Sequence, residues 1–292
     1  MTQLHTAVVT GASAGIGKAT AVALARMGWR VIGVGRDPER SAAAEAEIRA
    51  AAASRARVDF VRADFTLMSE VLRAAREIAT LTSSIEALIH NAGGVRDRLV
   101  VTAEGTEATF AANHLAPFLL TRELLPVLRA TARSRPPGTV RVIAVSSSGH
   151  AFCPGMNWDD LNLLQDFSTA AAYCQAKLAN LLFTRELARR AAADGIIAQC
   201  MHPGVVDSNF MAHADEVMRR YMRTQEPVPP EHPARTLVFL ATSPEAGRDG
   251  GRYFHDGQEV APAPQALDAA AARRLWEASE ALLAKLGHAP AQ

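Results

Sequence analysis

A glycine-rich stretch near the amino terminus constrains the fold of this chain more than any other feature. Residues 10–17 read TGASAGIG; they follow a short apolar run, 4–10, and open a helical pattern that Gly28 stops. Glycines let such a turn bend sharply and let its backbone approach a ligand closely. The helix that follows offers free N–H groups and a partial positive charge to a pyrophosphate. Its place between the first strand and the first helix favours a dinucleotide-binding turn over an ordinary glycine turn.

Short apolar strands alternate with helical patterns along the rest of the chain. Strands are expected at 30–35, 58–62, 87–90, 140–146 and 196–201, and helices at 38–53, 67–82, 106–131 and 168–190. We expect Pro117 and Pro126 to interrupt the 106–131 helix, and the prolines between 227 and 233 predict a loop. The alternation predicts an α/β fold with a doubly wound, mostly parallel sheet, the Rossmann fold.

The length and the hydrophobic content fit one domain. The chain has 292 residues, 49% of them hydrophobic, and neither an internal repeat nor a long linker divides it. We therefore expect a single domain over 1–292, with a substrate-binding insert at about 205–232 and a carboxyl-terminal helix at about 264–287.

Composition and charge argue against several classes of function. The 31 Lys and Arg residues balance 30 Asp and Glu, and the arginines are dispersed, so no nucleic-acid partner is expected. Three cysteines without a C-x-x-C pair and nine scattered histidines predict neither disulfides nor a metal site. No apolar run reaches the roughly 18 residues of a membrane helix. The first strand also begins too early for a signal peptide, so a cytoplasmic protein without a membrane anchor is expected.

Polar residues stand where several of the expected strands end. Asp64 follows the third strand, Asn91-Ala92-Gly93-Gly94 follows the fourth, and 146–148 (SSS) end the fifth. In a doubly wound sheet ligands bind beyond the carboxyl ends of the strands. These hydroxyl, amide and carboxylate groups are therefore expected around one crevice.

The helical segment 168–190 carries a candidate acid–base pair. Tyr173 and Lys177 are four residues apart, so they share one face of the helix. A free phenol titrates near ~10 and is a poor proton donor or acceptor at neutral pH. A nearby ammonium favours the phenolate and lowers the pKa of the phenol. The spacing alone is common, but the glycine turn and the polar crevice supply partners for it.

These motifs, in this order, resemble the short-chain dehydrogenases/reductases over residues 4–210. The matching segments are 10–17, 91–93, Ser147, Tyr173-x-x-x-Lys177 and Pro203-Gly204. The resemblance implies hydride transfer to or from the nicotinamide ring of a dinucleotide. It makes Tyr173 the proton donor to the substrate oxygen and Ser147 a hydrogen-bonding partner of that oxygen. It makes Lys177 the residue that binds the ribose hydroxyls and lowers the tyrosine pKa, and Asn113 the residue that holds a water in the proton relay.

The same resemblance predicts which residues contact the dinucleotide. They come from the glycine turn, from the ends of the following strands and from the catalytic helix: Gly11, Ser13, Ala14, Gly15, Ile16, Gly17, Arg36, Asp64, Phe65, Asn91, Ala92, Gly93, Tyr173, Lys177, Pro203, Gly204, Val206 and Ser208.

The end of the second strand predicts which dinucleotide is used. A carboxylate at this position binds the adenosine ribose hydroxyls of NAD and repels a 2′-phosphate. Here the strand ends Val34-Gly35-Arg36, and an arginine suits a phosphate. Asp37 is expected to cap the next helix instead of facing the ribose. Arg36, helped by Arg40, therefore predicts NADP(H).

Three segments resemble one group within the family more closely. Residues 112–121 (ANHLAPFLLT), 172–180 (AYCQAKLAN) and 202–206 (HPGVV) resemble the retinol dehydrogenase and WW-domain oxidoreductase group, whose bacterial relatives include anthracycline ketoreductases. With neither a WW module nor an expected anchor, the resemblance implies a soluble ketone or aldehyde with a bulky apolar body.

Two variable stretches, 149–167 and 208–230, are expected to hold this small-molecule substrate. Their apolar side chains are Phe152, Met156, Trp158, Phe167, Phe210, Met211, Met218, Tyr221 and Met222. Methionine-rich walls adapt to irregular ligands. Met211, Met218 and Met222 fall at helical spacing, however, so packing in the core stays open for each of them.

Other functions and an assembly also have to be considered. A catalytically silent dinucleotide sensor would share the fold, but it has no need of the set Asn113, Ser147, Tyr173 and Lys177.

Gly11-x-Ser13-x-Gly15 matches the nucleophile elbow of serine hydrolases. An elbow follows a central strand, with several strands before it in the chain, yet only ten residues precede Gly11, so the match argues weakly for a hydrolase. The family resemblance further implies a homodimer that pairs through the long helices.

Overall fold

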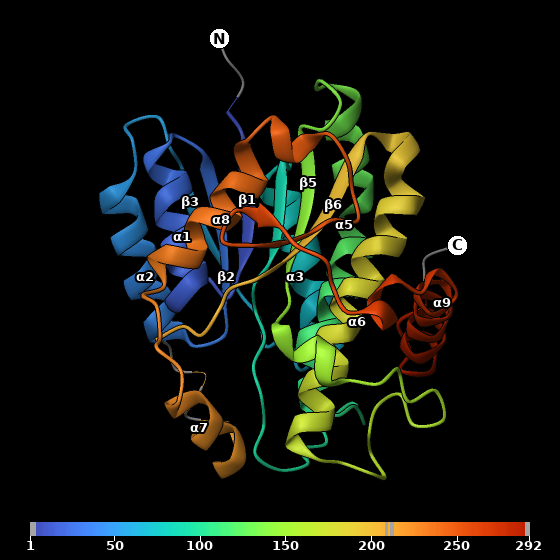
Figure 1. Ribbon diagram of the computed structural model, residues 1–292. Coiled ribbons are helices and arrows are strands. Elements are labelled where there is room, and N and C mark those ends of the chain that lie inside the picture. Colours follow the sequence, from blue (N-terminus) through green and yellow to red (C-terminus); the bar gives the residue numbers. More distant parts are fainter. Residues whose placement is uncertain (1–3, 208–209, 211–212, 290–292) are drawn as a thin grey trace.

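One eight-stranded sheet runs through the molecule, in the order β3-β2-β1-β4-β5-β6-β7-β8 (Figure 1). The computed structural model describes residues 4–207, 210 and 213–289. Neighbouring strands from β3 to β7 pair in parallel, and β8 pairs antiparallel with β7. The strands are β1 (Thr6–Thr10), β2 (Arg30–Gly35), β3 (Val58–Arg62), β4 (Ala87–His90), β5 (Val140–Val145), β6 (Ile196–His202), β7 (Tyr253–His255) and β8 (Gln258–Glu259). The predicted α/β doubly wound sheet is confirmed, and its strand order reverses between β1 and β4.

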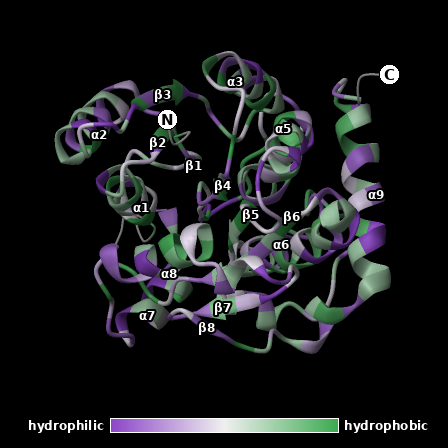
Figure 2. Cartoon of the chain, turned by 90° about the horizontal axis from the view of Figure 1, so that it is seen from above, coloured by the Kyte–Doolittle hydropathy of each residue, from purple (hydrophilic) through white to green (hydrophobic). Residues whose placement is uncertain are grey.

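Helices cover both faces of the sheet (Figure 2). One face carries α1 (Gly15–Arg26), α2 (Pro38–Ala51) and α8 (Glu231–Thr242), whose apolar residues form one core with the strands. The other face carries α3 (Met68–Leu81), α5 (Ala116–Arg133) and α6 (Thr169–Ala191), which enclose a larger core. Outside these, α9 (Ala269–Lys285) packs on α6 and contributes Ala272, Leu275 and Leu283 to that core. Strands covered on both faces explain the continuous apolar runs of the sequence.

Polar residues begin the helices where the sequence places them. Asp37 caps α2, with its carboxylate accepting from the backbone N–H of Arg40 at 2.8 Å. Ser168 caps α6 through the N–H of Ala171 at 3.1 Å, and Asp268 caps α9. Each cap satisfies N–H groups that a first helical turn leaves without a partner. Asp37 therefore points at its own helix, as predicted.

The helix expected at 106–131 is interrupted at a different place from the one predicted. It consists of α4 (Ala108–Phe110), a π-helical turn η1 (Ala111–Leu115) and α5. Pro117 lies in the first turn of α5, and Pro126 lies inside α5. The irregularity belongs to the turn that carries Asn113. Such π-turns often occur at functional sites.

The last third of the chain contains structure that the sequence did not reveal. The proline-rich stretch expected as a loop includes the start of α8, because Pro233 occupies its first turn. The short strands β7 and β8 were not predicted. A helix α7 (Glu216–Arg223) precedes α8, and one-turn 3₁₀ helices occur at η2 (Ser148–Phe152), η3 (Ala192–Asp194), η5 (Glu245–Gly247) and η6 (Pro264–Leu267). Among the described residues, no helix is long and apolar enough to span a membrane.

Candidate active site

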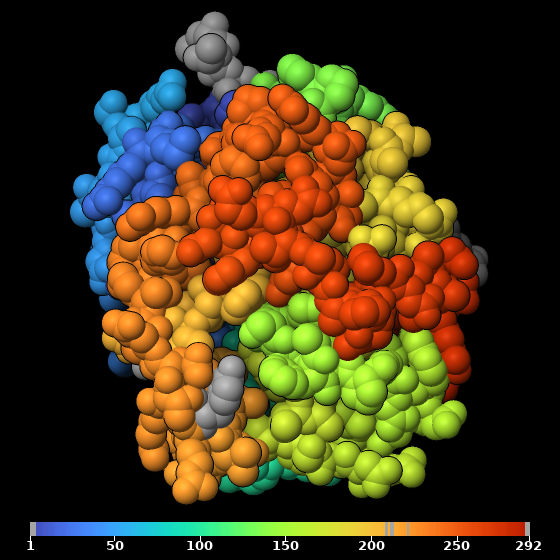
Figure 3. All heavy atoms as spheres, in the orientation of Figure 1, coloured from blue at the N-terminus to red at the C-terminus, as the bar shows by residue number. Residues whose placement is uncertain are grey.

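A cleft of about 1050 Å³ opens at the carboxyl ends of the parallel strands. Figure 3 shows a recess between α7, in orange, and the light-green segment that follows β5. Of the predicted catalytic and dinucleotide-binding residues, all but two line this cleft. The exceptions are Gly17, which lies beneath the turn, and Ser208, which is outside the described residues.

The glycine turn leaves the start of α1 open to the cleft. Gly11 and Gly15 have φ angles of +68° and +53°, which favour glycine. Gly17 packs so closely that a Cβ there would overlap the carbonyl oxygen of Gly11 and the side-chain amide of Asn91. Ala14 precedes the helix in an extended conformation, and no side chain caps it. The first N–H groups of α1 are therefore available to an anion such as a pyrophosphate.

The residues after β4 are fixed to the end of β1. The Thr10 hydroxyl accepts hydrogen bonds from the backbone N–H groups of Asn91, at 3.0 Å, and Ala92, at 2.9 Å. The Asn91 side-chain amide donates in return to the Thr10 carbonyl at 2.9 Å. The side chain of Asn91 thus joins two strands, while its place in the cleft wall comes from its backbone. Sequence reasoning missed this role of Thr10, whose signal is a hydroxyl at the last position of the first strand.

Ser147, Tyr173 and Lys177 meet at the centre of the cleft. Ser147 lies two residues past the end of β5, and its Oγ accepts a hydrogen bond from the N–H of Gly149 at 3.0 Å. The Lys177 Nζ lies 5.5 Å from the centroid of the Tyr173 ring and donates to the carbonyl of Val145 at 3.1 Å. The two side chains therefore share one face of α6, as their spacing predicts.

The expected fall in the pKa of Tyr173 is contradicted. Burial raises the pKa of Tyr173 to about 12, while a side-chain hydrogen bond with Ser147 opposes this rise. Burial also lowers the pKa of Lys177 to about 8. The ammonium faces the tyrosine ring and is held by a backbone carbonyl, so removal from water dominates both groups.

Asn113 is held in the π-turn by three hydrogen bonds. Its side-chain amide donates to the carbonyls of Thr109, at 2.7 Å, and Gly94, at 2.8 Å, and its Oδ1 accepts from the N–H of Gly94 at 3.2 Å. A Cβ on Gly93 would overlap Asn113 Oδ1 and come within 3.7 Å of Lys177 Nζ, so both side chains approach Gly93 from the side where a Cβ would stand. Asn113 and Lys177 therefore lie close together beside the loop after β4.

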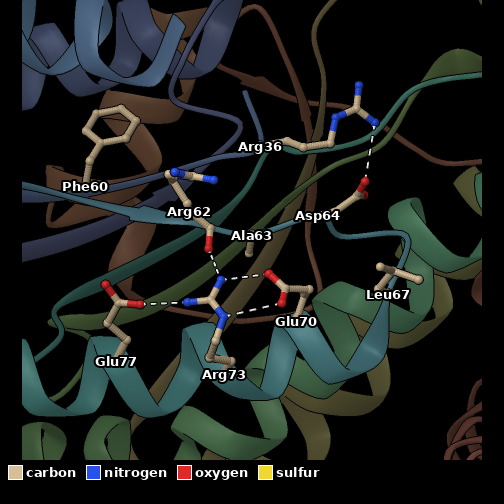
Figure 4. A pocket seen from close by; sticks show the side chains of 9 residues that line it. All are labelled: Arg36, Phe60, Arg62, Ala63, Asp64, Leu67, Glu70, Arg73 and Glu77. Carbon is tan, nitrogen blue, oxygen red and sulfur yellow. Dashed lines mark hydrogen bonds and ion pairs between the residues drawn. The ribbon is translucent and has the colours of Figure 1, made fainter. Parts of the chain in front are cut away.

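Arginines surround the end of the cleft beyond β2. Arg36 is more than half exposed and lies 3.7 Å from Asp64 (Figure 4). In the adjoining cavity of about 670 Å³, Arg73 is already held by Glu70, Glu77 and the carbonyl of Arg62.

Sequence reasoning missed a further arginine at this end, Arg96. It lines the cleft beside the glycines after β4, and its pKa is lowered by burial and by the nearby charge of Arg36. The only signal for it was a cation two residues after the Asn91 to Gly94 motif.

The substrate side of the cleft uses part of the predicted apolar set. Phe152, Phe210, Met218 and Met222 line it, and Phe210 meets the Tyr173 ring edge-on at 5.3 Å between centroids. Met156 instead lies in the core, Trp158 is partly buried and packs against it, and Phe167 does not line the cleft. Met211 is outside the described residues, as is the side chain of Tyr221. In the described parts of the chain, no three His, Cys, Asp or Glu side chains gather as metal ligands would.

Comparison with known proteins finds the same family along most of the chain. The short chain dehydrogenase profile matches residues 5–218. Retinol dehydrogenase 13 of Homo sapiens is 37% identical over 286 residues, which cover 95% of this chain and 84% of the relative. Polyprenol dehydrogenase of Mus musculus is 38% identical over 276 residues, which cover 92% and 81%. A solved structure of an uncharacterised protein from Mycobacterium Paratuberculosis is 33% identical, with a TM-score of 0.73, and the match covers 95% of this chain and 92% of that one.

Proposed function

The chain belongs to the short-chain dehydrogenase family, and on that premise we propose that it is an NADP(H)-dependent oxidoreductase that reduces a ketone or aldehyde to an alcohol. The observation that carries the proposal is the convergence of Ser147, Tyr173 and Lys177 on a cleft whose other wall is an uncapped helix start. A silent sensor or a hydrolase would leave this convergence without a purpose.

Each residue has a task in the proposed reaction. When bound, NADPH would supply the hydride for this reduction. The Tyr173 phenol donates a proton to the carbonyl oxygen as that oxygen gains charge, and Ser147 donates a hydrogen bond to the same oxygen. Lys177 would hold the ribose hydroxyls of the dinucleotide. Asn113, fixed in its π-turn, holds the water that returns the proton.

The residues at the two ends of the dinucleotide site fit the group. The glycine turn offers backbone N–H groups to the pyrophosphate, and Arg36 offers a planar, half-exposed cation beyond β2. Asp37 does not compete, because its carboxylate caps α2. Since no carboxylate takes the place of Gly35, these side chains favour a 2′-phosphate and hence NADP(H).

The apolar lining of the far side supports a bulky apolar substrate. Phe152, Phe210, Met218 and Met222 form that lining, and the relatives named for retinol and polyprenol point the same way. An aromatic polyketide ketone is one substrate of this description. A cytoplasmic location stays a prediction, as does the extent of the substrate-binding insert at 205–232.

The proposed homodimer needs a surface other than the outer faces of α5 and α6. Trp276 of α9 packs edge-on against Phe118 at 4.8 Å between centroids, and Glu280 pairs with Arg122 at 2.8 Å. Pairing through the two long helices would have to displace α9.

The test is consumption of NADPH and of NADH over a panel of ketones and aldehydes with apolar bodies of increasing size. We expect turnover with NADPH that improves with apolar bulk, and none with Tyr173→Phe as the matched control. Dinucleotide binding without turnover of any substrate would favour the sensor. Labelling of Ser13 by a fluorophosphonate would favour the hydrolase.

A further inference from the structure

A carboxyl-terminal segment crosses the loop that carries Ser147. We call residues 261–267 the strap. The backbone N–H of Ala263 in the strap donates to His150 Nε2 at 3.0 Å, and His150 Nδ1 lies 2.7 Å from the Ser147 carbonyl oxygen. We propose that His150 is a positioning residue through which the strap holds Ser147 in place. The inference rests on the proposed function, because it assigns the strap a part in that reaction.

The partners of His150 determine its protonation. The Ala263 N–H is a donor, so Nε2 must carry a lone pair. Nδ1 then carries the hydrogen and donates it to the Ser147 carbonyl. The imidazole is therefore neutral and bonded at both nitrogens. A second proton on Nε2 would face the Ala263 N–H and break the link.

The link is buried and has little freedom to move. His150 is 3% exposed, and the ring of Tyr253 in β7 packs edge-on against it at 5.2 Å between centroids. Gln265 of the strap donates to the Cys153 carbonyl at 2.6 Å, at the far end of η2. The strap thus grips the loop after Ser147 at two points, although Phe152 between them is 74% exposed.

The strap is itself anchored to the catalytic half of the molecule. It runs into α9, which Asp268 caps and which packs on α6, the helix of Tyr173 and Lys177. Ser279 of α9 hydrogen-bonds His114, next to Asn113, at 2.8 Å between Oγ and Nε2. The carboxyl-terminal segment therefore contacts the loop that carries Ser147 through the strap. It also contacts the π-turn that carries Asn113 through α9.

Losing the link should affect the reacting geometry more than dinucleotide binding. A displacement of about 1 Å in a catalytic group can cost about 100-fold in rate. His150 is not among the residues that line the cleft. The glycine turn follows β1, whereas His150 lies in the loop after β5. We expect a lower kcat with little change in the dissociation constant for NADPH.

The experiment uses two variants that break the same bond from opposite ends. His150→Asn keeps a donor near the Nδ1 position but loses the acceptor for Ala263. Ala263→Pro removes the donor N–H, and the Ala263 φ of −62° already suits proline. We expect each to lower kcat by about 10-fold and the double variant to be no slower than the slower single one, because both changes act through one link. Multiplied losses in the double variant, or unchanged kcat in either single one, would overturn the inference.

A second measurement decides the inference without turnover. Hydrogen exchange of the peptide 146–153 should speed up in Ala263→Pro and in Gln265→Ala, whereas exchange of 10–17 should not change. The control is Gln258→Ala on the exposed strand β8, which should alter neither peptide. Unchanged exchange of 146–153 in both strap variants would reject the link. A wild-type protein inactive on every carbonyl tested would remove the proposed function alone, since the exchange result still decides the role of the strap.

Discussion

The two walls of the cleft are built in different ways. The dinucleotide wall depends on backbone groups: the turn at 10–17, the positive φ angles of Gly11 and Gly15, and the free N–H groups at the start of α1. The substrate wall comes from side chains distant in sequence, such as Phe152, Met218 and Phe210, which meets the Tyr173 ring. A backbone wall is encoded in short contiguous motifs, whereas a side-chain wall depends on packing between elements that no local pattern connects.

Tyr173→Phe should have the largest effect, because the phenol stands where the two walls meet. The variant keeps the ring and its contact with Phe210 but loses the proton donor. We expect turnover to fall by at least ~10²–10⁴-fold with the affinity for NADPH unchanged. Steady-state kinetics and quenching of NADPH fluorescence measure the two quantities. A nearly normal rate would end the proposed mechanism.

Ser147→Ala should rank next. Its hydroxyl would stabilise charge that grows on the carbonyl oxygen, and its removal should cost ~10²–10³-fold in kcat. The matched control is Ser146→Ala. The Ser146 hydroxyl is buried and donates to the Lys177 carbonyl inside α6 at 2.8 Å, so its loss should lower stability more than the rate. A larger rate loss in Ser146→Ala would move the catalytic role to that residue.

The contrast between the walls also explains what the sequence could predict. The strands around the cleft and the glycine turn followed from local patterns, since apolar runs and glycines have the same meaning in any sheet of this kind. The π-turn at Asn113 could not be located, because the bonds of that side chain to Gly94, 19 residues earlier, are not visible in a local pattern. Nor could the raised Tyr173 pKa, which reflects burial by elements distant in sequence. Met156 and Trp158 were assigned to the substrate region by composition, but packing places Met156 in the core and Trp158 against it.

Arg36→Ala tests the dinucleotide wall at a side chain instead of the backbone. The guanidinium is expected to contact the 2′-phosphate alone, so the loss should be confined to NADP(H). A charge-assisted phosphate contact is worth about 1.5–3 kcal/mol. We expect kcat/KM with NADPH to fall by the corresponding factor while the value with NADH stays constant. Arg40→Ala serves as the control, since Arg40 also lines the cleft, and a smaller effect is expected. Equal efficiency of the wild type with both dinucleotides would refute the assignment.

Lys177→Met should have the smallest effect of the four substitutions. The quantity measured here is stability instead of rate, and we expect the variant to be more stable than the wild type. Burial lowers the pKa of Lys177 to about 8, so its charge costs free energy in the folded protein at pH 7. Methionine fills a similar space, and the Val145 carbonyl keeps the Asn180 amide as a partner at 3.3 Å. We expect a gain of about 1–2 kcal/mol in the free energy of unfolding at pH 7, or roughly 2–3 °C in Tm.

The stability difference between the wild type and Lys177→Met should depend on pH. Above pH 8 the folded protein loses the Lys177 proton first, while the unfolded chain holds its own up to about 10.4. The unfolded state then binds more protons, so the wild type gains stability as the pH rises through this window and the advantage of methionine shrinks. Thermal unfolding at pH 7 and pH 9.5 measures the change, with Lys285→Met on the exposed side of α9 as the control. A methionine variant that is less stable at pH 7 would show that Lys177 stabilises the fold. A gain that does not depend on pH would show that the gain does not come from removing the buried charge.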